Sequence, residues 1–303
     1  MTRIWVVLRW MVGAAILVFA VSILWRQWQS LTLQQIRAAW SGISMPAIVL
    51  SVLGTGLSFA CLAAYEWFAT WKVVPGRVPA IMALRVGAIS HAISNTLGFH
   101  ILTGSTLRYR VYRKLGLTAG DVARVIAAVG ACVVIGTITV SAIALGWLQV
   151  TASGWPMRLL LASLALLLGY VLSVRLRGRM PQALTIVLRS VGWLALLGVV
   201  EMLAAIGALY VLLPATSIPA PAPFALLFVT ATVLGVISHA PGGVGVFEAT
   251  VLAATPAAAH SRVLVALLAY RAIYNLLPFA VSVIVLLLRL LPASARNGDD
   301  ASV

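Results

Sequence analysis

Long apolar runs recur along this chain and limit its fold more than any other feature. A helix that crosses the hydrocarbon core of a bilayer needs about 20 mostly apolar residues. Six segments meet this requirement and are predicted to span a membrane, at roughly 5–25, 46–71, 122–149, 156–174, 191–213 and 263–290. The residues AVILMFWYC make up 62% of the 303 positions and charged residues 9%, whereas a soluble domain is about 25% charged. The composition excludes a soluble fold and predicts an all-α, polytopic integral membrane protein.

Two further apolar segments are interrupted. The first, 79–103, carries polar and ionisable residues that include Arg85, His91, Ser94, Asn95 and His100. The second, 222–258, contains the run His239-Ala240-Pro241-Gly242-Gly243-Val244-Gly245. A proline and three glycines so close together cannot continue a helix, so the chain must turn or unwind there.

The distribution of charge predicts how these segments are oriented. The chain has 21 basic and 6 acidic residues, a net charge of +15, which in a soluble protein would suggest a nucleic-acid ligand. In a membrane protein, basic residues instead collect in cytoplasmic loops. This rule predicts an inner-membrane protein with cytoplasmic N- and C-termini and no nucleic-acid partner. The same rule predicts that both interrupted segments are re-entrant, broken helices. This arrangement leaves Arg26 and Arg37 on the outer side of the membrane.

A weak internal repeat supports the pairing of the two interrupted segments. Residues 89–100 read ISHAISNTLGFH and residues 237–248 read ISHAPGGVGVFE, with five identities at a constant offset of 148. Five matches in twelve could arise by chance in a chain rich in Ala and Ile. Paired broken helices are typical of transporters built from inverted repeats. We therefore predict one membrane domain, 1–290, with repeat halves of about 40–149 and 190–290, and a cytoplasmic tail at 291–303.

Ionisable residues inside the membrane are the first candidates for a functional site, because each costs about 2.5–3.5 kcal/mol near the bilayer centre. The embedded acids are Glu66, Glu201 and Glu248, and the embedded bases are Arg85 and Arg271. Arg271, together with Arg85, could hold a lipid phosphate through a bidentate contact. Alternatively, Arg271 forms a structural ion pair with Glu201 or Glu248. The two hypotheses are compatible.

The turn at Pro241, Gly242, Gly243 and Gly245 suggests a second kind of donor. Unwound backbone and a helix start both present N–H groups that suit an anionic headgroup. The alternative is that the glycines only permit close packing. His91 and His239 each stand alone, as do Cys61 and Cys132, so neither a metal site nor a cofactor is predicted.

The basic run Arg108-Tyr109-Arg110-Val111-Tyr112-Arg113-Lys114 follows the first interrupted segment. On a cytoplasmic surface, each base would attract anionic lipid by about 1 kcal/mol. The same run could serve only as a topology anchor. The polar residues upstream, Ser94 and Asn95 among them, favour a surface where lipid headgroups approach. Motifs of hydrolases, zinc proteases and nucleotide-binding proteins are absent, so no catalytic residue is predicted.

Three stretches resemble a known family. They are ISNTLGFHILTGSTLRYRVYRKLGLTAGD, SHAPGGVGVFEA and LLAYRAIYNLLP, and together they resemble the membrane domain of the lysylphosphatidylglycerol synthase/flippase (multiple peptide resistance factor) family. The resemblance covers roughly residues 45–290. It implies translocation of phosphatidylglycerol or its lysyl ester, without the family's C-terminal synthase domain. The matching site residues are Arg108, Tyr109, Arg110, Pro241–Gly245, Glu248, Tyr270, Arg271 and Tyr274.

The function expected from the sequence is therefore that of a flippase-like translocator, or of a lipid-binding transport protein, for an anionic or aminoacylated phospholipid. Two alternatives remain: a membrane subunit that presents lipid to a separate synthase, and an intramembrane enzyme that modifies lipid headgroups. A secondary transporter of a small polar solute also fits the repeat. Besides phospholipids, the partners considered are a second copy of the chain and a separately encoded synthase.

Overall fold

The structure, a computed structural model, describes Arg37 and residues 40–97, 100–151, 191–214, 219–238 and 240–290. Every regular element within these residues is helical, which confirms the predicted all-α class. Four helices are long and apolar enough to cross a membrane: Met45–Val73, Ala119–Leu148, Gly192–Tyr210 and Ala257–Leu287. They match four of the six predicted spans. The predicted spans 5–25 and 156–174 and the tail 291–303 lie outside the described residues.

The first half of the described chain contains α3 (Met45–Val73), α4 (Ala80–Leu97), α5 (His100–Arg113) and α6 (Ala119–Thr151). The hydroxyl of Ser44 caps α3 by accepting the Ala47 N–H. Before α6, the Thr118 hydroxyl accepts the Asp121 N–H and the Asp121 carboxylate accepts the Thr118 N–H. This reciprocal arrangement satisfies two backbone donors at the helix start. The predicted interruption in 79–103 corresponds to the end of α4 and the start of α5.

The second half contains α9 (Val191–Tyr210), α10 (Pro221–Ile237), a short turn η1 (Pro241–Gly243) and α11 (Val246–Ala253). A second short turn, η2 (Ala257–Ala259), leads into α12 (His260–Tyr270), a π-helical turn η3 (Arg271–Leu276) and α13 (Leu277–Leu290). The predicted turn after α10 is confirmed. Gly242, Gly243 and Gly245 have φ angles of 59°, 66° and 90°, which residues with a Cβ atom rarely adopt.

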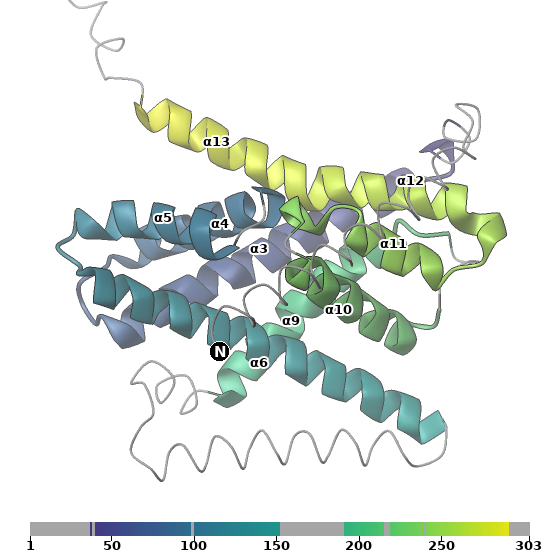
Figure 1. Cartoon of the computed structure of the whole chain (residues 1–303), viewed down its shortest axis with the longest axis horizontal. Helices are drawn as coiled ribbons and strands as arrows, with labels where there is room; N and C mark the ends of the chain where they lie inside the picture. Colours follow the sequence, from purple (N-terminus) through teal and green to yellow (C-terminus); the bar gives the residue numbers. More distant parts are fainter. Residues whose placement is uncertain are drawn as a thin grey trace, which may run out of the picture.

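The helices are arranged around α3 and α9, which cross in the middle of the molecule (Figure 1). The α12–α13 rod and α6 flank them on opposite sides, while the α4–α5 and α10–α11 pairs lie at opposite ends (Figure 1). Small residues permit the close crossings. A Cβ atom at Gly136 of α6 would lie 2.8 Å from the Cα of Gly198 in α9.

The outer surface of the spans is apolar. Among the described side chains, Leu53, Ile143, Leu203 and Ile284 are each more than half exposed. Glu66, Arg108, Glu201 and Glu248 are buried instead. Charged groups inside and apolar groups outside are what a protein surrounded by lipid requires. The molecule is therefore a helical membrane protein, as the composition predicts.

Candidate functional site

The two interrupted segments meet in space. At Gly242, a Cβ atom would lie 2.8 Å from the Thr96 carbonyl oxygen and 3.1 Å from that of Asn95. Asn275, in the π-helical turn, donates its Nδ2 to the Asn95 carbonyl at 2.9 Å, and the Thr96 hydroxyl donates to the Asn275 carbonyl at 3.0 Å. The end of α4, the glycine turn and the π-helical turn thus form one junction.

An ion pair between Arg271 and Glu248 holds the glycine turn to this junction. Arg271 Nε donates to Glu248 Oε1 at 2.6 Å, and Nη1 donates to the Gly242 carbonyl at 2.5 Å. The second carboxylate oxygen, Oε2, accepts the Gly245 N–H at 2.8 Å. Because Gly245 is the residue before α11, Glu248 also caps that helix. Of the two predicted acidic partners for Arg271, the structure selects Glu248.

Arg271 retains a donor that nothing in the described part of the chain uses. Its Nη2 is buried and has no hydrogen-bond partner. Three other buried side-chain atoms of the described residues lack partners, and all are neutral hydroxyls: Ser51 Oγ, Tyr65 Oη and Ser90 Oγ. An unsatisfied nitrogen on a permanent cation is more costly to bury than a hydroxyl. Within the described residues, Arg271 Nη2 is therefore a buried donor that lacks a hydrogen-bond acceptor.

Aromatic rings form one wall of the site. The Arg271 guanidinium lies 5.4 Å from the centroid of the Phe247 ring, within the range of a cation–π contact. Tyr270 stacks on Phe247 at 6.2 Å and on Tyr274 at 5.0 Å between centroids. Tyr270 and Tyr274 are both buried.

Glu201 has a different environment. Ser58 Oγ donates to Glu201 Oε1 at 3.0 Å and lies 2.7 Å from the Tyr274 hydroxyl. No ion pair of Glu201 occurs within the described residues. The alternative pairing of Arg271 with Glu201 is therefore not the one adopted.

A second buried ion pair joins α3 to α5. Arg108 Nε and Nη2 both lie 2.8 Å from Glu66 Oε2, and the Tyr112 hydroxyl donates to Oε1 at 2.8 Å. His91 Nε2 lies 3.5 Å from Arg108 Nη2. Burial and the neighbouring Glu66 carboxylate raise the pKa of Tyr112 well above its usual value, so Tyr112 acts as a neutral donor.

This pair corrects the interpretation of the basic run. Arg108 does not lie on the membrane surface with its neighbours, because it is on the inward face of α5 and 5% exposed. Tyr109 and Arg110 do lie on the exposed face. A run of consecutive residues cannot keep one orientation on a helix, since each residue turns by about 100°.

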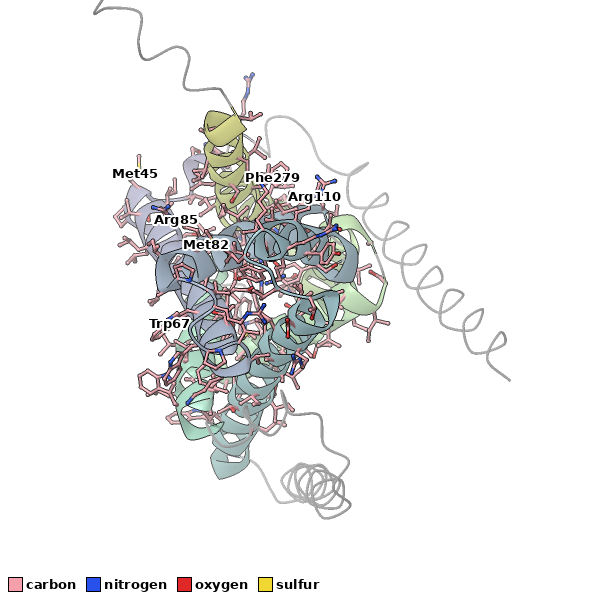
Figure 2. The ribbon with its side chains drawn as sticks, turned by 90° about the vertical axis from the view of Figure 1, so that its left-hand side faces the viewer. Met45, Trp67, Met82, Arg85, Arg110 and Phe279 are labelled. Atoms are coloured by element: carbon pink, nitrogen blue, oxygen red, sulfur yellow. The ribbon has the colours of Figure 1, made fainter. Side chains whose placement is uncertain are left out.

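The remaining predicted site residues are dispersed. Arg85 is exposed on α4 (Figure 2) and lies ten residues from Asn95, about 15 Å along the helix. The structure therefore does not bring Arg85 to Arg271. Ser94 is buried beside Gly104 and Arg108, where α4 packs on α5. His239 and the side chain of Pro241 lie outside the described residues.

Backbone donors of the glycine turn are partly used within the turn. The Gly243 N–H donates to the Ala240 carbonyl at 2.9 Å, and the Gly245 N–H donates to Glu248. These two groups do not fill the predicted role of headgroup donors, because they stabilise the turn itself. The close approach of Gly242 to Asn95 and Thr96 supports the alternative role of the glycines in packing.

Several residues of the site were not singled out in the sequence. Ser58 links Glu201 to Tyr274, Asn275 joins the two halves, and Tyr112 completes the Glu66 pair. A signal for Ser58 exists: Ser51, Thr55 and Ser58 follow helical spacing on an otherwise apolar segment. Nothing comparable marks Asn275 or Tyr112.

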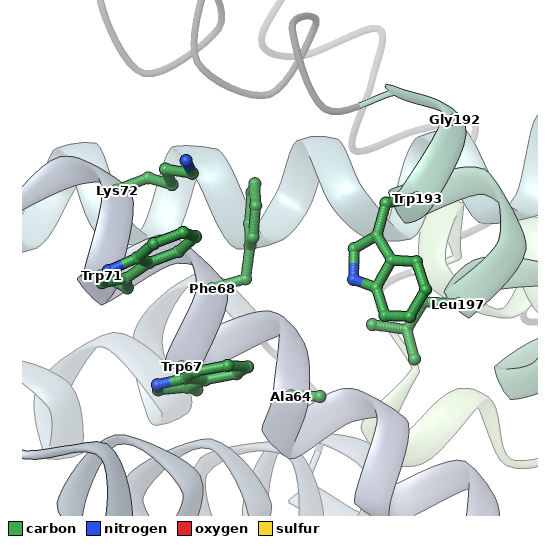
Figure 3. Close-up of a pocket in the computed structure, with 8 residues that line it drawn as sticks. All are labelled: Ala64, Trp67, Phe68, Trp71, Lys72, Gly192, Trp193 and Leu197. Atoms are coloured by element: carbon green, nitrogen blue, oxygen red, sulfur yellow. The ribbon is translucent and has the colours of Figure 1, made fainter.

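An aromatic groove lies at the other end of α3. It has a volume of about 580 Å³ and is lined by Ala64, Trp67, Phe68, Trp71, Lys72, Gly192, Trp193 and Leu197 (Figure 3). Trp67 and Trp71 stack at 6.2 Å, and Lys72 Nζ lies 3.9 Å from the Trp71 ring centroid. Tryptophan and lysine at a helix end are typical of the membrane–water interface.

Comparison with known proteins finds a relative that is similar over most of the chain. No family model matches the chain. A protein of Synechocystis sp. described as an uncharacterized protein is 29% identical over 286 residues, which cover 88% of this chain and 87% of that protein. The similarity extends over most of both chains, and it carries no activity from one to the other.

Proposed function

We propose that this protein is a lipid-transport protein of the bacterial inner membrane that binds an anionic or aminoacylated phospholipid through Arg271. The observation that carries the proposal is the buried Nη2 of Arg271, which has no partner among the described residues and lies at the junction of the two interrupted segments. A phosphate oxygen is the acceptor that suits a guanidinium best, since the two groups match in charge and geometry. The resemblance to the lysylphosphatidylglycerol synthase/flippase family points to the same class of ligand.

The turn and its ion pair would orient Arg271 for this role. Glu248 and the Gly242 carbonyl hold Nε and Nη1, so the unused edge of the guanidinium has a defined direction. A headgroup phosphate would bind this edge while the acyl chains remain in the surrounding lipid. For a lysyl ester, the buried carboxyl groups of Glu248 and Glu201 would attract the cationic amine.

The proposed architecture is an inverted repeat of six spans and two re-entrant pairs. In this arrangement α4–α5 and α10–α11 enter the membrane from opposite faces, and both termini lie in the cytoplasm. Irregular backbone at membrane depth is tolerated where it lines a polar path. The junction of Asn95, Gly242 and Asn275 would be that path, near the midplane where transporters of this type bind substrate.

Transport of labelled phosphatidylglycerol in proteoliposomes tests the proposal. Wild-type protein should move the lipid between leaflets, and Arg271→Gln should reduce the rate to that of protein-free vesicles. Arg262→Gln is the matched control, because Arg262 is an exposed arginine on the helix that precedes Arg271. Equal rates for wild type and Arg271→Gln would refute the proposed function. Binding without movement, together with a co-purifying synthase, would favour the lipid-presenting subunit.

A further inference from the structure

Glu201 is set apart from the other two buried glutamates by its neighbours. It is the eleventh of the 20 residues of α9, so it lies about 15 Å from either helix end. Glu201 is 6% exposed. Glu66 and Glu248 each have an arginine within 3 Å, whereas Glu201 has no ion pair among the described residues.

Within the described residues, the groups that face Glu201 come from α3, α6 and the α12–η3 segment, which pack on α9. Helix α3 contributes Ser58, Cys61 and Tyr65. The α12–η3 segment contributes Tyr270 and Tyr274. Cys132 of α6 lies beyond Tyr65. None of them is a cation. An ionised carboxylate at the middle of a spanning helix is expensive without a cation nearby. Binding a proton removes this cost.

A hydrogen-bonded chain connects Glu201 to the Arg271 site. With an ionised carboxylate, Ser58 donates to Glu201 and Tyr274 donates to Ser58. With a proton on Oε1, Glu201 can donate to Ser58 and Ser58 to Tyr274, so the Tyr274 hydroxyl hydrogen must turn away. Tyr274 is three residues after Arg271 in the same π-helical turn, and such turns are frequent at functional sites.

A second observation marks the same place. The Tyr65 hydroxyl is buried and has no partner among the described side chains and backbone, and a Cβ atom at Gly198 would lie 3.0 Å from it. Because Gly198 is one helical turn before Glu201, this unused hydroxyl lies against the part of α9 that carries the carboxyl group. It offers a donor and acceptor beside Glu201 in the crowded crossing of α6 and α9.

We infer that Glu201 is a proton-binding site whose occupancy is coupled to ligand binding at Arg271. The coupling rests on the proposed function, whereas the proton site does not. A proton taken from water adds to Glu201 Oε1 and leaves by the same bond when the group is exposed to the other side. Protonation removes a negative charge that Ser58 links to Tyr274, in the same π-helical turn as Arg271, so it favours an anionic ligand there. Affinity for phosphatidylglycerol should therefore rise as pH falls through the titration of Glu201.

Infrared difference spectroscopy of the full chain in nanodiscs tests the proton site directly. A protonated carboxyl group has a carbonyl stretch that a carboxylate lacks. Wild type should show this band, which should grow as pH falls, and Glu201→Gln should lack it. If Glu201→Gln does not fold, Glu201→Asp should shift the band. A wild-type band that is absent, or that persists unchanged in Glu201→Gln, would overturn the inference.

Binding of phosphatidylglycerol as a function of pH, measured on the same samples, tests the coupling. Wild type should bind about tenfold more tightly on the acidic side of the titration. Glu201→Gln should bind tightly at every pH, and Tyr274→Phe should keep the infrared band but lose the pH dependence. Equal pH dependence in wild type and Glu201→Gln would overturn the coupling. A band without lipid binding at any pH would sustain the proton site and refute the proposed function.

Discussion

Two buried arginine–glutamate pairs, Glu66–Arg108 and Glu248–Arg271, share the same chemistry but differ in how many of their hydrogen-bonding groups are satisfied within the described residues. In the first pair, the side chains of Glu66 and Arg108 are 0% and 6% exposed, and Tyr112 occupies the second carboxylate oxygen. In the second, Arg271 is 16% exposed and its Nη2 has no partner in the part of the chain that the structure describes. We call Glu66–Arg108 the closed pair, because both Glu66 oxygens accept hydrogen bonds there. In the Glu248–Arg271 pair, one arginine donor is unused within the described residues.

The backbone around the two pairs also differs. Glu66 and Arg108 join two regular helices, α3 and α5. Glu248 and Arg271 join a helix start to a π-helical turn, where the backbone itself is irregular. The two pairs therefore share their residue types and their burial. They differ in the backbone around them and in the number of donors that are satisfied within the described residues.

Removal of the acid from the closed pair should have the largest effect. Glu66→Gln leaves the Arg108 charge buried without a counter-charge, and breaking such a pair costs about 3–5 kcal/mol. We expect a loss of folded protein, or a large fall in the unfolding temperature in detergent. Glu248→Gln is the matched variant and should cost less, because Arg271 is partly exposed and keeps the Gly242 carbonyl. Equal losses would show that both pairs are structural.

Gly242→Ala should have the next largest effect, since it disturbs only the irregular site. The positive φ angle alone costs a residue with a Cβ about 1–2 kcal/mol, and the new atom would meet the Thr96 carbonyl. Gly116→Ala shares the positive φ angle but has open space around it, so it isolates the backbone term. Unfolding temperatures that fall equally for the two variants would mean that the contact with α4 contributes nothing.

Tyr112→Phe should weaken the closed pair without breaking it. The variant removes one hydrogen bond to a carboxylate, an interaction worth about 1.5–3 kcal/mol, and leaves the packing of the ring intact. Tyr109 is exposed on the outer face of α5, so Tyr109→Phe should leave thermal stability unchanged. If the two variants unfold alike, the Tyr112 hydroxyl does not support Glu66.

Glu248→Gln should have the smallest and most informative effect on ligand binding. Glutamine retains a carbonyl acceptor for Arg271 but removes the negative charge that competes with a phosphate. Affinity for phosphatidylglycerol should rise by up to about tenfold, which corresponds to about 1.4 kcal/mol. Measured by lipid binding to purified protein, a large fall in affinity would indicate that Glu248 itself contacts the headgroup.

The local parts of this picture could be predicted from the sequence, and the tertiary parts could not. The turn at Pro241–Gly245 follows from the chemistry of proline and glycine alone, and the long apolar runs predict the helices. The inward direction of Arg108 depends on the rotation of α5 against α3, which a basic run does not encode. Ser58 contacts Glu201 across 143 positions and Tyr274 across 216. Such partners are known only once the helices are packed.

The contact between a lipid phosphate and Arg271 Nη2 can be measured directly by solid-state NMR. Protein with ¹⁵N-labelled arginine, reconstituted in phosphatidylglycerol, should show ³¹P-induced dephasing of guanidinium signals. Part of this dephasing should vanish in Arg271→Gln and survive in Arg262→Gln. Dephasing that is the same in wild type and Arg271→Gln would contradict a phosphate site at Arg271.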